Sequence, residues 1–298
     1  MPFVRNRDNF IRDFIVLREA DAAVAEQKDG LISVLMSVYN NAPTLEAAAD
    51  SVLRQSYGNL ELILCDDAST DGTWEIMQRI AARDKRVLCF QNEKNLGLGA
   101  SLNRGLARSA GEYIARQDAD DLSDPDRLEK TLAFLLAENA PYAGCGVRVF
   151  DDYGVWSTRQ FPQKITRHII AQKNPFFHPT MIFRRGVLEA VGGYSESAVT
   201  RRTEDYDLVM RLAAQGIIGE NLQEILYSVY EPPEAYLRHT AKTRMMEVRV
   251  RWRGFHLMGV PMRDYIYLAK PLIMAMIPRC ALKTVKRIQW SRQKKGRN

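Results

Sequence analysis

Aspartates gather in the segment YIARQDADDLSDP (residues 113–125), where four of them fall between positions 118 and 124. Carboxylates this close raise one another's pKa unless a cation or hydrogen-bond donors offset their charge. A hard divalent cation is the simplest compensation, because Mg²⁺ and Mn²⁺ prefer oxygen ligands and often bind a few carboxylates together with substrate phosphates. The D-x-D spacing of Asp118 and Asp120 therefore predicts a metal-dependent phosphate clamp.

Further polar and aromatic residues follow two other apolar runs. Ser37 and Tyr39 lie at the end of the run LISVLMSVYN, and Asp67 is the second residue of the acidic loop DDASTDGT, which follows LELILC. Helix capping and turn formation account for one carboxylate per loop but not for the excess, so Asp67, Asp118 and Asp120 are functional candidates. Four residues of these loops are expected to be mainly structural caps or turn residues: Ser69, Asp71, Ser123 and Asp124. Tyr39 is expected to stack on a base.

Alternating strand and helix patterns position these residues. Short β-rich runs alternate with segments of helical periodicity, such as PTLEAAADSVLRQ, whose apolar residues recur at i, i+3, i+4 and i+7. The predicted strands are residues 31–40, 60–65, 87–90 and 112–117. Repeated units of this kind predict an α/β fold with a mostly parallel, Rossmann-like central sheet flanked by helices. Ligands of such sheets bind at the carboxyl ends of the strands, so the acidic loops and Tyr39 should share one crevice.

Charge is distributed unevenly along the 298 residues. Residues 241–298 carry 15 Lys and Arg against two acidic residues, whereas residues 1–240 carry a net charge of −7. A nucleic-acid partner is therefore not expected for the main body. The four cysteines lack metal-site spacing and suit reduced core thiols, and the start of the chain has no run of signal-peptide length, so we expect a cytoplasmic protein.

The composition divides the chain into three expected parts. Residues 1–30 form an N-terminal extension, residues 31–240 one catalytic domain, and residues 241–298 a basic, amphipathic helical region. Within the domain, residues 31–122 and residues 123–240 are expected to form two halves. The basic region is interrupted by Lys and Pro and suits a segment lying on an anionic membrane surface, which predicts peripheral attachment to the inner face of the membrane. A helical lid packed on the domain is the alternative.

Several motifs in this order resemble those of a known family. ISVLMSVYN, DDASTDGT, NLGLGASLNRGLARSAGEYIARQDADD and TEDYDLVMRLAAQG are similar to the motif series of family 2 inverting glycosyltransferases, which have the GT-A fold. The similarity spans about residues 31–230. It implies that residues 31–122 bind the nucleotide-sugar donor and residues 123–240 the acceptor. It implies a metal-dependent transferase that moves a sugar from a nucleotide-diphospho-sugar, with Mn²⁺ or Mg²⁺ as cofactor.

The resemblance also implies roles for individual residues. Ser37 and Tyr39 match positions that meet the nucleoside, with Tyr39 stacking on the base, and Asp67 matches the residue that bonds the base edge. Asp118 and Asp120 match the D-x-D pair, with Asp120 as the surer metal ligand and Asp118 nearer the ribose and sugar of the donor.

Asp205 matches the catalytic base of the family. An inverting transfer needs one carboxylate to accept the proton of the acceptor hydroxyl, and Asp205 opens a predicted helix, where the ionised form is favoured. Acidic residues at this position also occur simply as complements of the helix dipole. His178, in NPFFHPTM, is a candidate metal ligand near the acceptor, and a hydrogen-bonded loop histidine is the alternative.

The sequence thus predicts an inverting glycosyltransferase of cell-surface polysaccharide biosynthesis, with a UDP-sugar as donor and a glycan or lipid-linked acceptor. A sugar-1-phosphate nucleotidyltransferase is a second hypothesis, although the loop VYNNAPTL lacks the Gly and Arg that a triphosphate loop needs. A non-enzymatic membrane-binding adaptor is a third, and it rests on the basic tail alone. One departure from the family is Glu231-Pro232-Pro233, which stands where a basic, diphosphate-binding cluster would begin.

Overall fold

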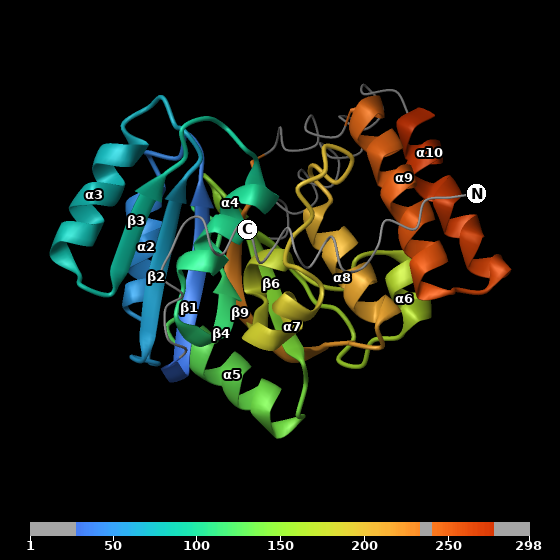
Figure 1. Cartoon of the computed structure of the whole chain (residues 1–298), viewed down its shortest axis with the longest axis horizontal. Coiled ribbons are helices and arrows are strands. Elements are labelled where there is room, and N and C mark those ends of the chain that lie inside the picture. Colours follow the sequence, from blue (N-terminus) through green and yellow to red (C-terminus); the bar gives the residue numbers. More distant parts are fainter. Residues whose placement is uncertain (1–27, 233–239, 277–298) are drawn as a thin grey trace, which may run out of the picture.

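A computed structural model describes residues 28–232 and 240–276 (Figure 1). Most of the expected N-terminal extension, residues 1–27, and the end of the basic tail, residues 277–298, lie outside the described residues. Within the described part, nine strands form one sheet, in which eight follow the order β3-β2-β1-β4-β8-β6-β9-β5 and β7 pairs with β6.

The first half of the sheet is parallel, as the sequence pattern predicts. Its strands are β1 (Lys28–Val38), β2 (Leu60–Asp66), β3 (Val87–Gln91) and β4 (Gly111–Arg116). The helices that follow or connect them are α2 (Leu45–Leu53), α3 (Thr73–Arg83), α4 (Leu98–Arg108) and α5 (Arg127–Ala137). Each predicted strand and helix of this half is therefore present.

Alternate residues of the central strands face two apolar layers. Val34 and Leu62 pack in the cluster that contains the buried faces of α2, α3 and α5. Leu35 and Ile63 pack in the second cluster, with Leu102 of α4. This alternation follows from the two-residue period of a strand. The parallel pairing of β1 with β2 and with β4 places the carboxyl ends of these three strands at one edge of the sheet.

The second half of the sheet is mixed rather than parallel. Its strands are β5 (Leu122–Ser123), β6 (Tyr142–Asp151), β7 (Gly154–Arg159), β8 (Ile182–Arg184) and β9 (Glu220–Tyr230). β6 pairs with β9 in parallel, but β4–β8, β6–β8, β6–β7 and β5–β9 are antiparallel. The two-residue turn between β6 and β7 allows only an antiparallel hairpin, because a parallel pair needs a long crossover. The α/β prediction is confirmed, and the sheet is more mixed than expected.

Short helices connect the strands of the second half, and three helical segments follow it. The connecting helices are α6 (Arg167–Gln172), η1 (His178–Thr180), α7 (Arg185–Ala190) and α8 (Glu204–Ala214). The C-terminal segments are α9 (Ala241–Met258), η3 (Met262–Leu268) and α10 (Ala269–Met276). The described part of the basic region is thus helical, as predicted.

Helix α9 begins and ends at well-defined caps and packs on α8. Thr240 and Thr243 form a reciprocal capping box, and Gly259 ends the helix with a φ of 62°. Gly254 lies against Met210 of α8 so closely that a side chain there would overlap it. The inner face of α9 is therefore part of the core, although the sequence alone left its packing open.

Candidate active site

The carboxyl ends of β1, β2 and β4 meet at one pocket with a volume of about 660 Å³. Its wall includes five residues that the sequence analysis selected, namely Ser37, Tyr39, Asp67, Asp118 and Asp120. The other side of the wall comes from later segments of the chain: Arg201, Arg202 and Glu204 before and within α8, and Lys242, Thr243 and Met246 of α9. The convergence expected from parallel strand ends is present, and α9 closes the pocket from a part of the chain that the motifs did not indicate.

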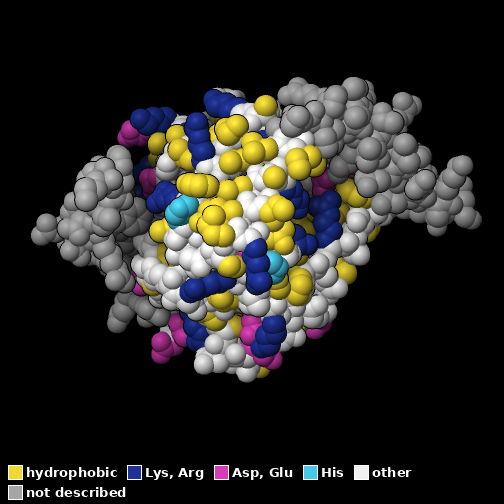
Figure 2. Space-filling model, turned by 90° about the vertical axis from the view of Figure 1, so that its right-hand side faces the viewer, with side chains coloured by type: hydrophobic (Ala, Val, Ile, Leu, Met, Phe, Trp, Pro, Cys, Tyr) yellow, Lys and Arg dark blue, Asp and Glu magenta, His cyan; other side chains and the backbone are white. Residues whose placement is uncertain are grey.

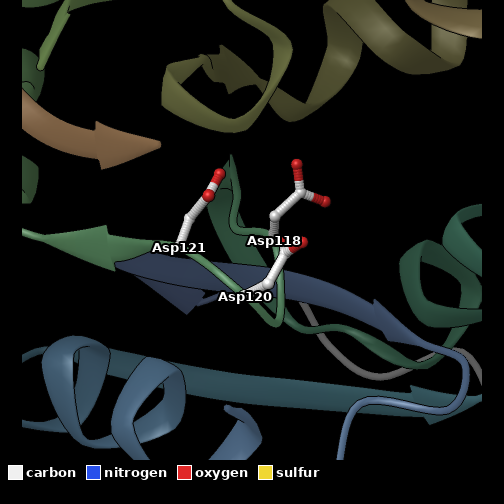
Figure 3. A group of neighbouring side chains, drawn as sticks. All are labelled: Asp118, Asp120 and Asp121. Carbon is white, nitrogen blue, oxygen red and sulfur yellow. The ribbon is translucent and has the colours of Figure 1, made fainter. Parts of the chain in front are cut away.

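Three carboxylates after β4 form a compact group in this pocket region. Asp118, Asp120 and Asp121 each offer an oxygen, and these oxygens all lie within 4.8 Å of one another (Figure 3). Burial and the charges of Asp118 and Asp120 raise the pKa of Asp121 well above its usual range. An all-oxygen set of clustered carboxylates fits Mg²⁺ or Mn²⁺. Asp121, expected only as a neighbour of the pair, belongs to the group.

Arg116 is a buried cation that contacts this carboxylate group. Arg116 is the last residue of β4 and is only 3% exposed. Its Nη1 donates a hydrogen bond to Oδ1 of Asp118. This contact raises the pKa of the Arg116 guanidinium above its ordinary value despite burial. The Nε of Arg116 is buried and has no hydrogen-bond partner among the described residues. Sequence reasoning missed Arg116, although a cation inside an otherwise apolar strand next to an acidic loop was a usable signal.

Asp67 shapes a loop that lines the pocket together with Asn95 and Gly97. Its Oδ1 accepts hydrogen bonds from the Leu96 amide (2.8 Å) and the Asn92 side chain (2.9 Å), and its Oδ2 accepts one from the Gly97 amide (2.9 Å). A carboxylate oxygen has two acceptor sites, so Oδ2 retains one for a ligand. Asp67 therefore holds the backbone of the loop in place and still has capacity to bond a base edge.

Tyr39 presents an exposed aromatic ring at the end of β1. The side chain is 48% exposed and lines the pocket. The adjacent Asn40 adopts a φ of 53° and is tied to the next acidic loop, because its side chain accepts from the Thr70 amide (2.8 Å) and its amide donates to Ser69 (2.9 Å). The ring is thus free for stacking while the backbone beside it is fixed.

The expected cap residue Asp71 is satisfied within the protein. Its carboxylate accepts hydrogen bonds from the Thr73 amide (3.2 Å) and the Ala42 amide (3.1 Å), and also from the Thr73 hydroxyl. These bonds lower the pKa of Asp71, although burial opposes them. Asp71 thus connects the loop at Ala42 with Thr73, the first residue of α3.

Asp205 lies in the first turn of α8, beside the pocket wall formed by Glu204. Asn174 donates from Nδ2 to Oδ2 of Asp205 at 2.7 Å. Burial raises the pKa of Asp205, while this hydrogen bond, the backbone amides and the charge of Arg116 act in the opposite direction. A carboxylate with a raised pKa that is held at a helix N-terminus is suited to accept a proton.

His178 is hydrogen-bonded to another side chain instead of joining the carboxylate group. Its Nε2 lies 2.9 Å from the hydroxyl of Tyr194, and the two rings are in edge contact. Burial and the nearby charge of Arg116 lower the pKa of His178 well below its usual value, which keeps the imidazole neutral. Its predicted role as a metal ligand stays a prediction.

The fold and the acidic pocket define an α/β protein with a ligand site at the strand ends, and comparisons with known proteins specify its class. The sequence profile of glycosyl transferase family 2 matches residues 33–192. EpsE of Bacillus subtilis (strain 168), which is named as a glycosyltransferase, is 42% identical over 267 residues, covering 89% of this chain and 96% of that protein. The chain belongs to glycosyl transferase family 2 and is a glycosyltransferase.

Two further similarities bear on the fold and on the donor. WfaP of Escherichia coli is 29% identical over 203 residues, covering 67% of this chain and 78% of that protein, and its name is UDP-Glc:alpha-D-GlcNAc-diphosphoundecaprenol beta-1,3-glucosyltransferase. The mannosyltransferase PcManGT from Pyrobaculum calidifontis, solved in complex with GDP-Man and Mn²⁺, superposes with a TM-score of 0.60 at 19% identity, covering 94% of this chain and 86% of that one. The family membership decides against the nucleotidyltransferase and adaptor hypotheses.

Proposed function

We propose that this protein is an inverting glycosyltransferase that transfers a sugar from a nucleotide-diphospho-sugar, with UDP as the nucleotide, to a glycan or lipid-linked acceptor in cell-surface polysaccharide biosynthesis. The observation that carries the proposal is the meeting of Ser37, Tyr39, Asp67, Asp118 and Asp120 in one pocket of a family 2 chain. The name of WfaP, with its UDP-sugar and diphosphoundecaprenol-linked acceptor, supports the choice of donor and acceptor.

In this proposal the donor lies along the strand ends. Tyr39 stacks on the base, Ser37 meets the nucleoside, and the open acceptor site on Oδ2 of Asp67 bonds the base edge. Asp118 and Asp120, with Asp121 beside them, would hold a Mn²⁺ or Mg²⁺ ion. When bound, such an ion would neutralise charge on the diphosphate, as divalent ions do in phosphate chemistry.

Asp205 acts as the general base in this proposal. It accepts the proton of the acceptor hydroxyl as the hydroxyl oxygen forms a bond to the anomeric carbon and the bond from that carbon to the diphosphate breaks. Asn174 keeps the carboxylate oriented through its 2.7 Å hydrogen bond, and Arg116 supplies positive charge that favours the ionised form. His178 remains a candidate ligand whose present partner is Tyr194.

The protein is proposed to act at the cytoplasmic face of the membrane. Of the helices that the structure describes, none is both long and apolar enough to cross a bilayer. Attachment would then be peripheral and would involve the basic C-terminal region, of which residues 277–298 lie outside the described residues.

Calorimetric titration with UDP and GDP, with and without Mn²⁺, tests the donor site. We expect Mn²⁺-dependent binding of UDP, and we expect Asp120→Ala to weaken it by more than about tenfold, because one of a few metal ligands is lost. Asp126→Ala is the matched control, since Asp126 lies close by in sequence but pairs with Lys130 at the surface. Binding that is independent of metal and unchanged in Asp120→Ala would refute the clamp.

A further inference from the structure

Apolar side chains are exposed on three consecutive elements at the C-terminal end of the described chain. They are the outward-facing residues of α9, η3 and α10: Met245, Trp252, Leu257, Met262, Ile266, Leu272 and Ile273. Met262 and Ile266 are 81% and 71% exposed, more than the other exposed large apolar residues of the described ranges. Figure 2 shows hydrophobic side chains gathered over this side of the molecule, with Lys and Arg side chains between and around them. We name these residues the C-terminal face.

Packing against the domain does not require these residues, because other residues of the same elements already form the core contact. Val250, Phe255 and Met258 are the buried side of α9, and they belong to the cluster that contains α8. Arg251 is also inward, where its guanidinium donates to the Ala171 carbonyl at 3.1 Å and lies over the ring of Tyr206. Helix α9 is therefore apolar on two sides. Among the described residues, its outer apolar residues are not part of the core cluster, and Trp252 packs edge-on against Tyr265 of η3. Contiguous exposed apolar side chains commonly mark an interaction surface.

Unpaired positive charge accompanies the apolar residues. Arg249, Arg253 and Lys270 are exposed on the same elements, and no ion-pair partner is found for them within the described ranges. The two acidic residues of these elements have other partners and do not neutralise these three cations. Glu247 pairs with Arg244 and Arg251, and Asp264 is buried, 2.9 Å from His168. The face that remains is apolar and cationic, which is complementary to an anionic lipid headgroup layer above an acyl core.

Helix α9 also connects this face with the pocket. Lys242, Thr243 and Met246, at its start, line the pocket, and Trp252 on the C-terminal face follows Lys242 by ten residues, or about 15 Å of helix. A membrane surface in contact with the C-terminal face would therefore lie one short segment of α9 away from the α9 residues that line the pocket.

We propose that the C-terminal face binds a bilayer that contains anionic lipid, and that it brings the pocket within reach of a saccharide linked to a membrane lipid. The second part rests on the proposed transferase function, whereas the docking itself does not. A second copy of the chain is a poorer occupant. An isologous contact would place the same cationic face against itself, and like charges across an interface disfavour association.

Sedimentation of the full-length protein with vesicles tests the docking. The vesicles are phosphatidylcholine alone and phosphatidylcholine mixed with an equal amount of phosphatidylglycerol. We expect binding to the mixed vesicles. We expect Met262→Glu combined with Ile266→Glu to weaken it by roughly a hundredfold, since burying one such side chain is worth about a factor of ten or more. Because both side chains are largely exposed, the substitutions remove little internal packing.

Two further variants separate the apolar and the electrostatic contributions. Arg249→Ala and Arg253→Ala should each weaken binding to the mixed vesicles by about fivefold and leave binding to phosphatidylcholine alone unchanged. Leu136→Glu is the matched control, because Leu136 is an exposed apolar residue of α5, outside the C-terminal face, and it should bind as the wild type does.

The outcomes distinguish docking from the transferase proposal. UDP titration with Mn²⁺ should give the same affinity for the wild type and for the Met262→Glu/Ile266→Glu variant. If the transferase proposal is wrong, the titration will show no UDP binding, and the vesicle assay will be unaffected. Wild-type protein that does not bind mixed vesicles, or a double variant that binds them as well as the wild type, would overturn the inference. A wild-type dimer that the double variant converts to monomer, without vesicle binding, would assign the face to self-association and would likewise overturn it.

Discussion

Replacing Arg116 by methionine tests whether this buried cation offsets the charge of the carboxylate group. The substitution keeps an unbranched side chain at a site that is 3% exposed and removes the donor to Asp118. Two unit charges about 4 Å apart gain roughly 4 kcal/mol at an effective dielectric constant of about 20. Desolvation of the guanidinium offsets part of this, and the Asp118 side chain is 35% exposed, so water solvates it again after the change. We therefore expect the free energy of unfolding to fall by about 1–3 kcal/mol.

Urea unfolding with EDTA and with Mn²⁺ is the assay for this prediction. Without Arg116, the three carboxylates repel one another more strongly. Added Mn²⁺ should therefore stabilise Arg116→Met more than it stabilises the wild type. Combining Arg116→Met with Asp118→Leu removes both partners and should recover part of the lost stability in EDTA. An unfolding midpoint equal to that of the wild type in EDTA, together with an equal response to Mn²⁺, would show that Arg116 does not offset the charge of this group.

Four other expectations concern the proposed base and His178. Asp205→Asn should retain Mn²⁺-dependent UDP binding and lose transfer by about 10²–10⁴-fold, and unaltered transfer would place the base elsewhere. Burial raises the pKa of Asp205, so transfer should decline on the acidic side as pH falls through that raised value and the base is protonated. Asn174→Ala removes a bond that lowers this pKa and should move the acidic limb of the kcat profile to higher pH; an unmoved limb contradicts the assignment. His178→Gln should leave the Mn²⁺ dependence of UDP binding within about twofold, and a loss of tenfold or more would restore His178 as a ligand.

The first half of the sheet could be predicted well from the sequence, because the patterns that specify its strands and helices are local. The alternation of strand and helix patterns fixes which ends of β1, β2 and β4 meet, and this places Tyr39, Asp67 and Asp120 in one pocket without knowledge of distant contacts. Residue types at those positions then indicate what chemistry the pocket can perform.

Contacts between distant segments were the part that the sequence could not predict. Lys242 enters the pocket from a helix more than a hundred residues after the acidic loops. The pairing of His178 with Tyr194 depends on how η1 packs against the loop before α8, and no periodic pattern encodes it. The antiparallel pairing of β8 depends on contacts with strands that are distant in sequence. A strand of three residues is too short for its sequence pattern to indicate this pairing.

The hydrogen bonds of Asp67 have a consequence for altering donor selectivity. Because Asp67 fixes the backbone at Leu96 and Gly97, the loop is already ordered before a nucleotide arrives, and binding does not have to supply the entropy of ordering it. The same bonds join the proposed base contact of Asp67 to the loop, so a substitution of Asp67 intended to change the base preference would also release the loop. The affinity of the proposed site for a nucleotide should instead be adjusted at Tyr39, whose ring is 48% exposed and can be changed without loosening the loop.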